Sequence, residues 1–389
     1  MLDNLFHSGR WPIALDIGTD SIKMLQMHQA DKTVAVSACG RWRFPDIPIS
    51  DTKQRRELAV SAVREMLKKA GFSGRRVVSS MGSSQLCIKN VRVPHMNESE
   101  LRAALAWEAK ERFEFDVPAD QLGYINAGEV RQANEARDEI IMLAVPQPVI
   151  EEHMEMLDAM GLRAEHIDAE PIALFRVFER FLRRSEDEQT VSIIVEVGSS
   201  VTRVVVARGM QIVFLKSIDI GGRKLSEVVA SHLNLTFSEA SDLRMRIMQE
   251  NSSRDRRSIS LEAQRREDPN SLQWTVYDAV RGEVEALAKE ISLCLRYCSV
   301  TFRGLRCSSV TLTGGEAYDP ALCELLSQHL GVTCEIGQPL KGFDISGLDL
   351  GNRRGMLAEW AVCAGLGIRD MDIKHVSKEG DHGESRLSA

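Results

Sequence analysis

Two similar stretches decide how this chain folds: Ile13–Lys23, which reads IALDIGTDSIK, and Ile193–Arg203, which reads IIVEVGSSVTR. Each begins as an apolar strand that ends in an acid, turns at a glycine and two polar residues, and continues as a second strand. One such hairpin is common, and the alternative interpretation is two ordinary hairpins. Two copies set well apart in one chain instead suggest two similar lobes that close on a polyanionic ligand.

The turns of both hairpins have the composition of an anion site. Gly18 and Gly198 can adopt positive φ and let a phosphate approach the backbone. The N–H groups that follow can form a concave anion nest together with nearby hydroxyls, which are those of Thr19, Ser21, Ser199 and Ser200. Lys23 on the second strand can neutralise a phosphate, and the alternative is an exposed strand lysine.

The acids that end the two first strands indicate a metal. Asp16 and Glu196 would face each other across a cleft, where acids repel phosphates unless a divalent cation lies between them. Mg²⁺ suits this arrangement because it keeps several waters and needs only one or two carboxylates besides phosphate oxygens. We therefore expect both acids to hold Mg²⁺ through water, and Glu196 is a candidate catalytic residue. The alternative for Glu196 is a hydrogen-bonded remnant of a lost site.

Composition argues against several classes of protein. The chain has 389 residues, which favours two or three domains, and a formal net charge of −7, which argues against non-specific binding of nucleic acid. No apolar run approaches the roughly 20 residues of a membrane span, and the N-terminus does not resemble a signal peptide. The 8 cysteines form no CxxC motif and fit a reducing compartment, so we expect a cytoplasmic protein. Neither an HExxH motif nor a P-loop is present.

The order of predicted elements repeats with the hairpins. A three-strand meander over residues 12–44 is followed by helices and strands, and a second meander over 191–219 is followed by helices and a strand. The charged, polar stretch 183–190 lies between these halves and reads as a hinge. This pattern predicts a pseudo-duplicated α/β chain with mixed sheets, in contrast to the regular strand–helix alternation of doubly wound folds.

Together with the hairpins, a third motif resembles the actin-like ATPase superfamily. Residues 310–316 read VTLTGGE and look like its adenosine motif, in which a strand ends in two glycines, here Gly314 and Gly315. The alternative for these glycines is a helix-entry turn. Within the superfamily, the chain is more similar to the PilM family of type IV pilus assembly. Further stretches carry this resemblance, at residues 99–116, 144–162, 166–170, 218–222 and 360–366.

The resemblance implies an actin-like two-lobed fold, in which two RNase H-like domains have mixed sheets and the first lobe carries an inserted α+β subdomain. The implied boundaries are 10–87 and 165–188 for the first lobe, 88–164 for the insertion, 189–368 for the second lobe with a helical part at 223–300, and 369–389 for a disordered tail.

The resemblance also implies that ATP binds between the lobes with Mg²⁺, with weak or no hydrolysis. The nucleotide-binding residues that it implies are Asp16, Gly18, Thr19, Asp20, Ser21, Lys23, Gly198, Ser199, Ser200, Thr202, Gly221, Gly222, Gly314, Gly315 and Glu316.

The implied partner is the N-terminal cytoplasmic tail of a PilN-like bitopic inner-membrane protein, which would bind in a groove beside the insertion. The protein would then be a cytoplasmic scaffold of a type IV pilus or related assembly platform, peripheral at the inner membrane through that partner. Self-association into a homo-oligomer is left open. We expect Trp107 to be a buried anchor of the insertion, and Met154, Met156 and Met160 to pack in the core.

Three positions depart from the pattern of the family. Glu196 stands where Asp is usual, and its extra methylene disturbs a water-mediated Mg²⁺ geometry. Ser241 stands where the ribose-binding helix of relatives often has Glu. The turn Phe113–Asp116 lacks the prolines of the family. The first two departures lower our expectation of hydrolysis and of tight ATP binding, and the third bears on the partner groove.

Two other functions stay open. A small-molecule kinase of the same superfamily would need a catalytic Asp near the cleft and a substrate pocket in the first lobe, and the sequence indicates neither. A filament-forming division protein of the FtsA type would need an amphipathic membrane helix at the C-terminus, whereas residues 374–389 are polar.

Overall fold

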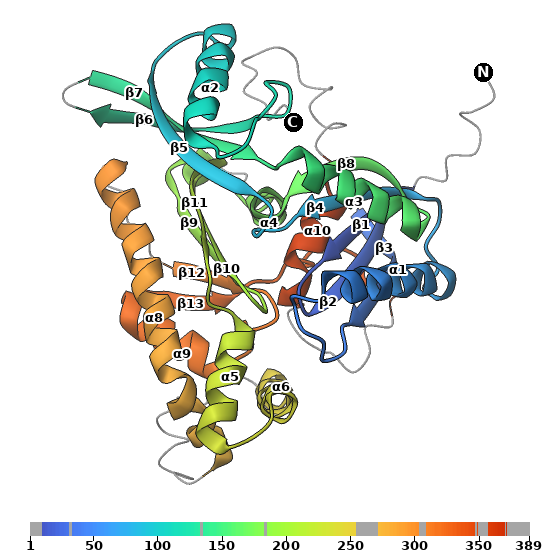
Figure 1. The fold of residues 1–389 in the computed structure, drawn as a ribbon. Helices are drawn as coiled ribbons and strands as arrows, with labels where there is room; N and C mark the ends of the chain where they lie inside the picture. Colours follow the sequence, from blue (N-terminus) through green and yellow to red (C-terminus); the bar gives the residue numbers. More distant parts are fainter. Residues whose placement is uncertain are drawn as a thin grey trace.

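The first lobe is built on a five-stranded sheet with the order β3-β2-β1-β4-β8 (Figure 1). The computed structural model describes residues 10–30, 33–132, 135–182, 185–253, 271–302, 309–346, 348, 357–369 and 371. The strands of this sheet are β1 (Arg10–Ile17), β2 (Ser21–Ala30), β3 (Thr33–Arg43), β4 (Arg76–Met81) and β8 (Arg163–Ala169). β1, β2 and β3 form an antiparallel meander, and β4 and β8 add parallel strands beside β1.

Strand alternation divides the residues of β1 between two buried layers. Ile13 and Leu15 pack in a core with α1 (Thr52–Lys69) and α3 (Gln147–Met160), whereas Ala14 faces a second core that includes α4 (Glu170–Glu179). Both faces of the sheet are therefore covered, which explains why the N-terminal hairpin is so apolar.

The second lobe repeats the first sheet strand for strand. Its order is β11-β10-β9-β12-β13, and its strands are β9 (Val191–Val197), β10 (Thr202–Arg208), β11 (Gln211–Ile218), β12 (Ser309–Thr313) and β13 (Thr333–Ile336). Again three strands form an antiparallel meander and two run parallel to its first strand. The predicted α/β fold with mixed sheets is confirmed, and both predicted meanders match the observed strands to within two residues. A short helical turn, η2 (Ser185–Gln189), precedes this lobe.

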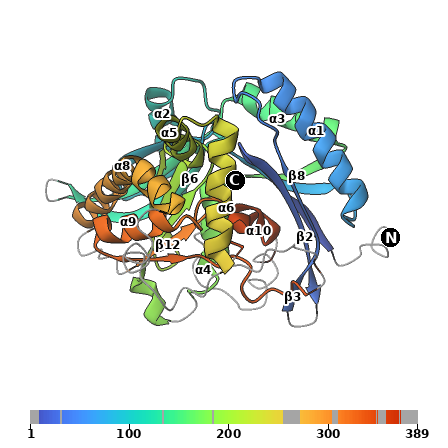
Figure 2. The same ribbon diagram turned by 90° about the horizontal axis from the view of Figure 1, so that it is seen from below.

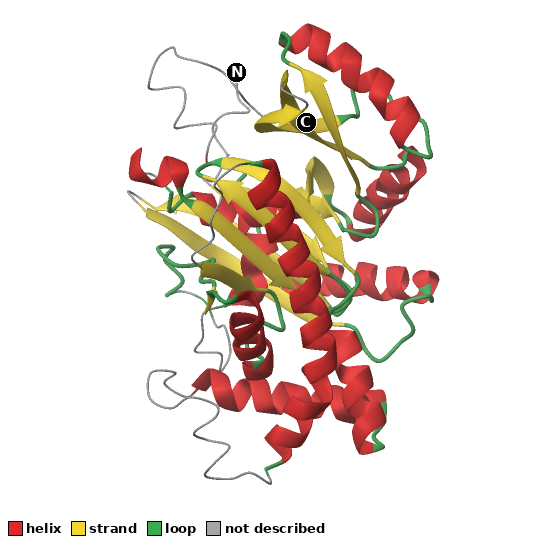
Figure 3. Ribbon diagram, turned by 90° about the vertical axis from the view of Figure 1, so that its left-hand side faces the viewer, coloured by secondary structure: helices red, strands yellow, loops and turns green. Residues whose placement is uncertain are grey.

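Helices gather on one side of the second sheet (Figure 3). They are α5 (Gly222–Leu233), α6 (Phe237–Ser253), α8 (Leu272–Thr301) and α9 (Pro320–Leu330). α8 packs against α5, α9 and β11, while α6 packs against α5. Most of the polar stretch 250–270, which we expected to be a mobile loop or a helix extension, lies outside the described residues.

The insertion contains a three-stranded sheet with the order β5-β7-β6. Its elements are β5 (Cys87–Pro94), α2 (Glu98–Arg112), β6 (Gly123–Gln132) and β7 (Glu135–Ala144). α2 begins at a reciprocal capping box between Asn97 and Glu100. The insertion also contacts the second lobe, because β6 packs against β11 and the Tyr297 hydroxyl of α8 donates to Glu139 Oε1 at 3.0 Å.

Two side chains that we expected in the core lie at the surface. Trp107 on α2 is 62% exposed and Met154 on α3 is 38% exposed, so these two predictions were wrong. Met156 and Met160 on the same helix as Met154 pack in the core, as predicted. The buried stripe of α2 consists of Leu101, Leu105 and Ala109. Trp107 falls off this stripe, two positions beyond Leu105, where a helix turns its side chain away from the core.

The last described helix crosses back to the first lobe. η3 (Ala358–Trp360) leads into α10 (Ala361–Gly367), which packs against β1, β2 and α4 (Figure 1). A β-carbon on Gly365 would overlap the carbonyl of Ala173, so α10 and α4 approach each other to backbone contact. The predicted boundary at 368 assigned this helix to the second lobe, whereas its contacts lie in the first. Of the tail predicted as disordered, all but Arg369 and Met371 lies outside the described residues.

Among the described helices, none combines the length and the apolar character that a membrane crossing requires.

Candidate functional site

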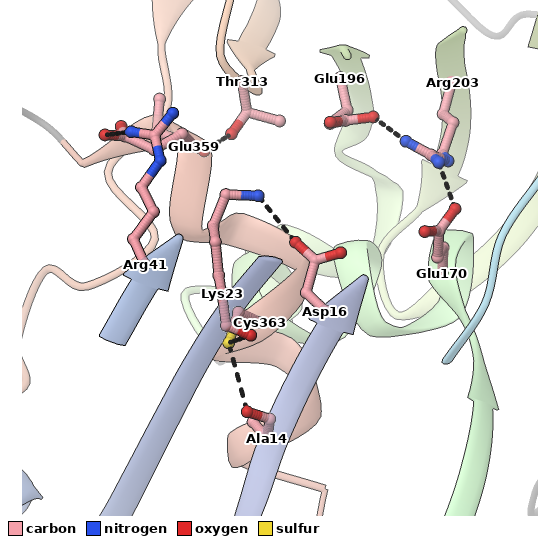
Figure 4. Close-up of polar contacts among 11 residues, drawn as sticks. Ala14, Asp16, Lys23, Arg41, Glu170, Glu196, Arg203, Thr313, Glu359 and Cys363 are labelled. Carbon is pink, nitrogen blue, oxygen red and sulfur yellow. Dashed lines mark hydrogen bonds and ion pairs between the residues drawn. The ribbon is translucent and has the colours of Figure 1, made fainter. Parts of the chain in front are cut away.

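The two hairpins place an acid and a cation opposite each other in the same register. Asp16 on β1 pairs with Lys23 on β2, and Lys23 Nζ lies 2.9 Å from Asp16 Oδ2. Glu196 on β9 pairs with Arg203 on β10, and their side chains form an ion pair. Only 5% of Asp16 and 8% of Glu196 is exposed. Each acid that we expected to hold Mg²⁺ therefore has a cationic partner from its own hairpin (Figure 4).

Arg203 also reaches from the second lobe into the first. Its guanidinium forms a second ion pair with Glu170, the first residue of α4 (Figure 4). Its Nε also donates to Ser83 Oγ at 2.7 Å. The Ser83 N–H in turn donates to Glu170 Oε2 at 3.2 Å. One guanidinium thus joins the second hairpin to two segments of the first lobe.

Burial and charge together set the pKa values of this cluster. Burial raises the pKa of Glu170 to about 7; Arg203 opposes this shift, while the carboxylates of Asp16 and Glu196 add to it. Burial acts to lower the pKa of Arg203, but the carboxylates of Glu170 and Glu196 outweigh it, and the net shift is upward. The pKa of Lys23 is raised because Asp16 likewise outweighs burial. Since Asp16 acts on groups from both lobes, the two hairpins face one shared cluster of charges.

The turns of the two hairpins close in the same way. The Gly18 N–H donates to Ser21 O at 3.0 Å, and the Gly198 N–H donates to Val201 O at 3.0 Å. Ser200 Oγ is buried and has no hydrogen-bond partner among the described residues, so it offers a polar atom to an anion. The Thr202 hydroxyl instead donates to a backbone carbonyl, that of Ile220, at 2.6 Å.

The start of α5 lies directly against the second hairpin. The Gly222 N–H donates to Gly198 O at 2.9 Å, and the Arg223 N–H donates to Ser199 O at 2.7 Å. A β-carbon on Gly221 would come within 2.6 Å of Ser199 O. The N–H groups of Gly222 and Arg223 are therefore bonded to carbonyls of the hairpin, whereas a phosphate at the start of α5 would need such groups as donors.

The third motif meets the second hairpin at Gly314. This residue has a φ of 92°, and a β-carbon on it would overlap Val197 O, so both its conformation and its surroundings require glycine. The Glu316 N–H donates to the same Val197 carbonyl at 3.3 Å. A β-carbon on Gly315 would meet open space. The strand end that we expected to approach a nucleoside thus lies beside the hairpin that we expected to bind its phosphates.

A buried arginine of α6 occupies the region next to this motif. Arg244 Nη2 donates to Glu316 Oε2 at 2.6 Å and to Asp319 Oδ2 at 2.8 Å. Arg244 Nη1 donates to Gly222 O at 2.9 Å and to Ser226 Oγ at 3.0 Å. The Glu316 carboxylate lies so close to Gly222 that a β-carbon on this glycine would overlap it. Both residues were expected to bind the nucleotide, and here they contact each other.

The space left beside this network is small. The cavity that borders Arg244, Tyr277 and Asp319 has a volume of about 10 Å³, which suffices for about one water molecule. This cavity lies between α6, α8 and the start of α9, and it is too small for a nucleoside.

The turn of the first hairpin faces α6 of the second lobe. Arg43 Nε donates to Asp20 Oδ1 at 3.0 Å, and Arg43 Nη2 donates to Ser241 Oγ at 3.3 Å. Arg55 on α1 donates to the carbonyl of Thr19. Figure 2 shows α6 between the helices of the second lobe and the strands β2 and β3 of the first. Ser241, which we expected to stand at the position of a ribose-binding acid, thus contacts the other lobe.

Three residues of the site were not assigned from the sequence: Glu170, Arg203 and Arg244. Arg203 carried a signal, because it takes the place of Lys23 in the repeated stretch. Glu170 follows a strand and precedes a proline at a helix start, which is a common place for a polar group of a site. Arg244 carried a weaker signal, which is a basic residue three positions after Ser241.

The chain is similar to several known proteins. A family model described as type IV pilus assembly protein PilM matches residues 14–253. The chain also resembles a solved structure described as a PilM–PilN type IV pilus biogenesis complex, with a TM-score of 0.73, 21% identity, and coverage of 92% of this chain and 98% of that chain. Another is the ethanolamine utilization protein EutJ from Carboxydothermus hydrogenoformans, with a TM-score of 0.50, 14% identity, and coverage of 92% and 89%. At these identities the two structures establish a shared actin-like fold.

Proposed function

The chain belongs to the PilM family of type IV pilus assembly proteins, and on this basis we propose that it is a cytoplasmic scaffold that binds the N-terminal cytoplasmic tail of a PilN-like bitopic inner-membrane protein. The observation that carries the proposal is its similarity to a PilM–PilN complex over 92% of the chain. Through this partner the scaffold would be peripheral at the inner membrane.

We place part of the partner contact on the outer face of α2. Trp107 is 62% exposed there, and Ala103 and Lys110 beside it are also exposed. Exposed tryptophans are frequent anchors of protein interfaces because they bury a large apolar area at low entropic cost. The insertion that carries α2 is braced on the second lobe through Tyr297, which would hold this face in a fixed position.

Binding of a labelled peptide with the sequence of the partner tail tests this proposal. We expect saturable binding, with an affinity limited by the ordering of the tail, and an affinity about tenfold weaker for Trp107→Ala. Met210→Ala is a matched control, because Met210 is a 68% exposed apolar side chain on the second lobe. No binding to the wild-type protein, with or without ATP, refutes the scaffold function. Equal binding by Trp107→Ala and Met210→Ala refutes the contact on α2.

The ligand that we propose for the cleft is ATP, with weak or no hydrolysis. The facing hairpins and the unpartnered Ser200 hydroxyl support binding of phosphates. The nucleoside would enter only when Glu316 leaves Gly222, so we expect weak affinity. Calorimetric titration with ATP tests this proposal, and heat of binding should be detectable without turnover. Turnover of ATP that a sugar stimulates would instead favour the small-molecule kinase. The polar tail at 374–389, which bears on the FtsA-type alternative, lies outside the described residues.

A further inference from the structure

The polar centre between the lobes contains three buried carboxylates around one guanidinium. Asp16, Glu170 and Glu196 are at most 8% exposed, and the side chain of Arg203 is 14% exposed. Arg203 forms ion pairs with Glu170 of the first lobe and Glu196 of the second, and Asp16 contributes to the charge around it. Figure 4 shows Arg203 between these two glutamates.

The repeated hairpins show what is particular to Arg203. Lys23 holds the same register position in the first hairpin, and its ammonium contacts the acid of its own hairpin. Arg203 contacts its own hairpin acid through Nη1, but it also reaches Glu170 through Nη2 and Ser83 through Nε. A guanidinium presents several donors in a rigid fork, whereas an ammonium is a compact point charge. Arg203 can therefore link the two lobes, whereas Lys23 at the equivalent position contacts an acid of its own lobe.

A divalent metal does not fit this arrangement. Mg²⁺ requires oxygen ligands at about 2.0–2.1 Å in near-octahedral geometry. The guanidinium already lies between the carboxylates of Glu170 and Glu196, and its positive charge would repel a second cation. Asp16, the other acid that we expected to hold Mg²⁺, is paired with Lys23. The sequence thus predicts a metal where the structure places two cationic side chains.

We propose that Arg203 is a fixed internal cation that takes the place of a divalent metal between the lobes and links them without Mg²⁺. This proposal goes beyond the scaffold function and does not depend on the identity of the partner. It predicts that the wild-type protein is indifferent to divalent cations and that removal of the guanidinium creates a need for them.

Titration with Mn²⁺ alone, read by the paramagnetic signal of the free ion, tests the proposal on the full chain. Wild-type protein should show no saturable site. Arg203→Ala leaves the carboxylates without their cation and should show a saturable Mn²⁺ site that the wild type lacks; its thermal unfolding midpoint should rise with added Mn²⁺. Arg76→Ala is the matched control, because it removes an ion pair with Glu165 at the surface and should leave the protein indifferent to Mn²⁺.

Two results would overturn the proposal. One is an Arg203→Ala protein that folds and remains indifferent to Mn²⁺. The other is a saturable Mn²⁺ site in the wild-type protein that Glu196→Gln abolishes, and this measurement decides the matter even if Arg203→Ala does not fold. Neither experiment contains peptide or nucleotide, so a failure here is distinct from a failure of the scaffold function.

Discussion

Protonation of His153 should destabilise the protein in mild acid. His153 lies on α3 and is 5% exposed, and its Nε2 lies 2.8 Å from Oγ of Ser79, which is fully buried on β4. Burial lowers the pKa of His153 to about 4. The contact fastens α3 to the sheet of the first lobe, so its loss weakens the packing of this helix on the sheet.

The sign and the size of the effect follow from the two pKa values of His153. In the unfolded chain the imidazole binds a proton below its ordinary pKa of 6.5, whereas in the folded protein it does so only below about 4. Between these values the unfolded state holds more protons, so the free energy of unfolding decreases as the pH falls. At 1.36 kcal/mol per pKa unit, the loss is about 3 kcal/mol once the pH reaches the lower value.

Urea unfolding from about pH 7 to about pH 4 measures this loss. His153→Gln keeps a polar group near Ser79 but cannot titrate, so its free energy of unfolding should decrease less than that of the wild type, by about 3 kcal/mol across the window. His232→Gln removes an exposed histidine of α5 and serves as the control. Equal acid slopes for the wild type and His153→Gln would show that His153 does not carry the effect.

Two further predictions concern the Arg244 network. Arg244→Ala should cost about 3–5 kcal/mol in urea unfolding, because it leaves the buried carboxylates of Glu316 and Asp319 without their cation; a loss below about 1 kcal/mol, the size of a surface pair, would contradict this. Glu316→Ala should raise ATP affinity in calorimetry by about tenfold, since it uncovers Gly222. Glu285→Ala removes a surface acid as the control, and weaker ATP binding by Glu316→Ala would mean that Glu316 itself contacts the nucleotide.

The backbone of both lobes was predictable because the signals that fix it are local. Val191–Val197 is apolar and rich in β-branched residues, and its counterpart in the first hairpin is also apolar at its centre. Each is followed by a turn of a glycine and two polar residues, which is typical of a tight hairpin. Repetition of this pattern predicted two similar sheets, and the identical strand orders bear this out. The exposure of Trp107 could also have been predicted, because the apolar stripe formed by Leu101, Leu105 and Ala109 leaves this residue on the outer face of α2.

The side-chain partners in the cleft were not predictable in the same way. Arg203 meets Glu170 only because the start of α4 lies next to β10, and these residues belong to different lobes. Glu316 follows a correctly predicted strand end, but its direction is set by Arg244 from α6. The sequence therefore indicated which backbone segments meet, while the charges that fill the space between them depend on the tertiary arrangement.

The packing of α10 against β1 and α4 has a consequence for how the protein is made. β1 and α4 emerge from the ribosome much earlier than α10, which packs against both. This layer is complete only when Gly365 of α10 lies against the backbone of Ala173 in α4. At 5–20 residues per second, synthesis of the intervening roughly 190 residues takes about 10–40 s. During that interval the surface of the N-terminal half that α10 later covers stays exposed. This layer is complete only after the C-terminal half of the chain has been synthesised.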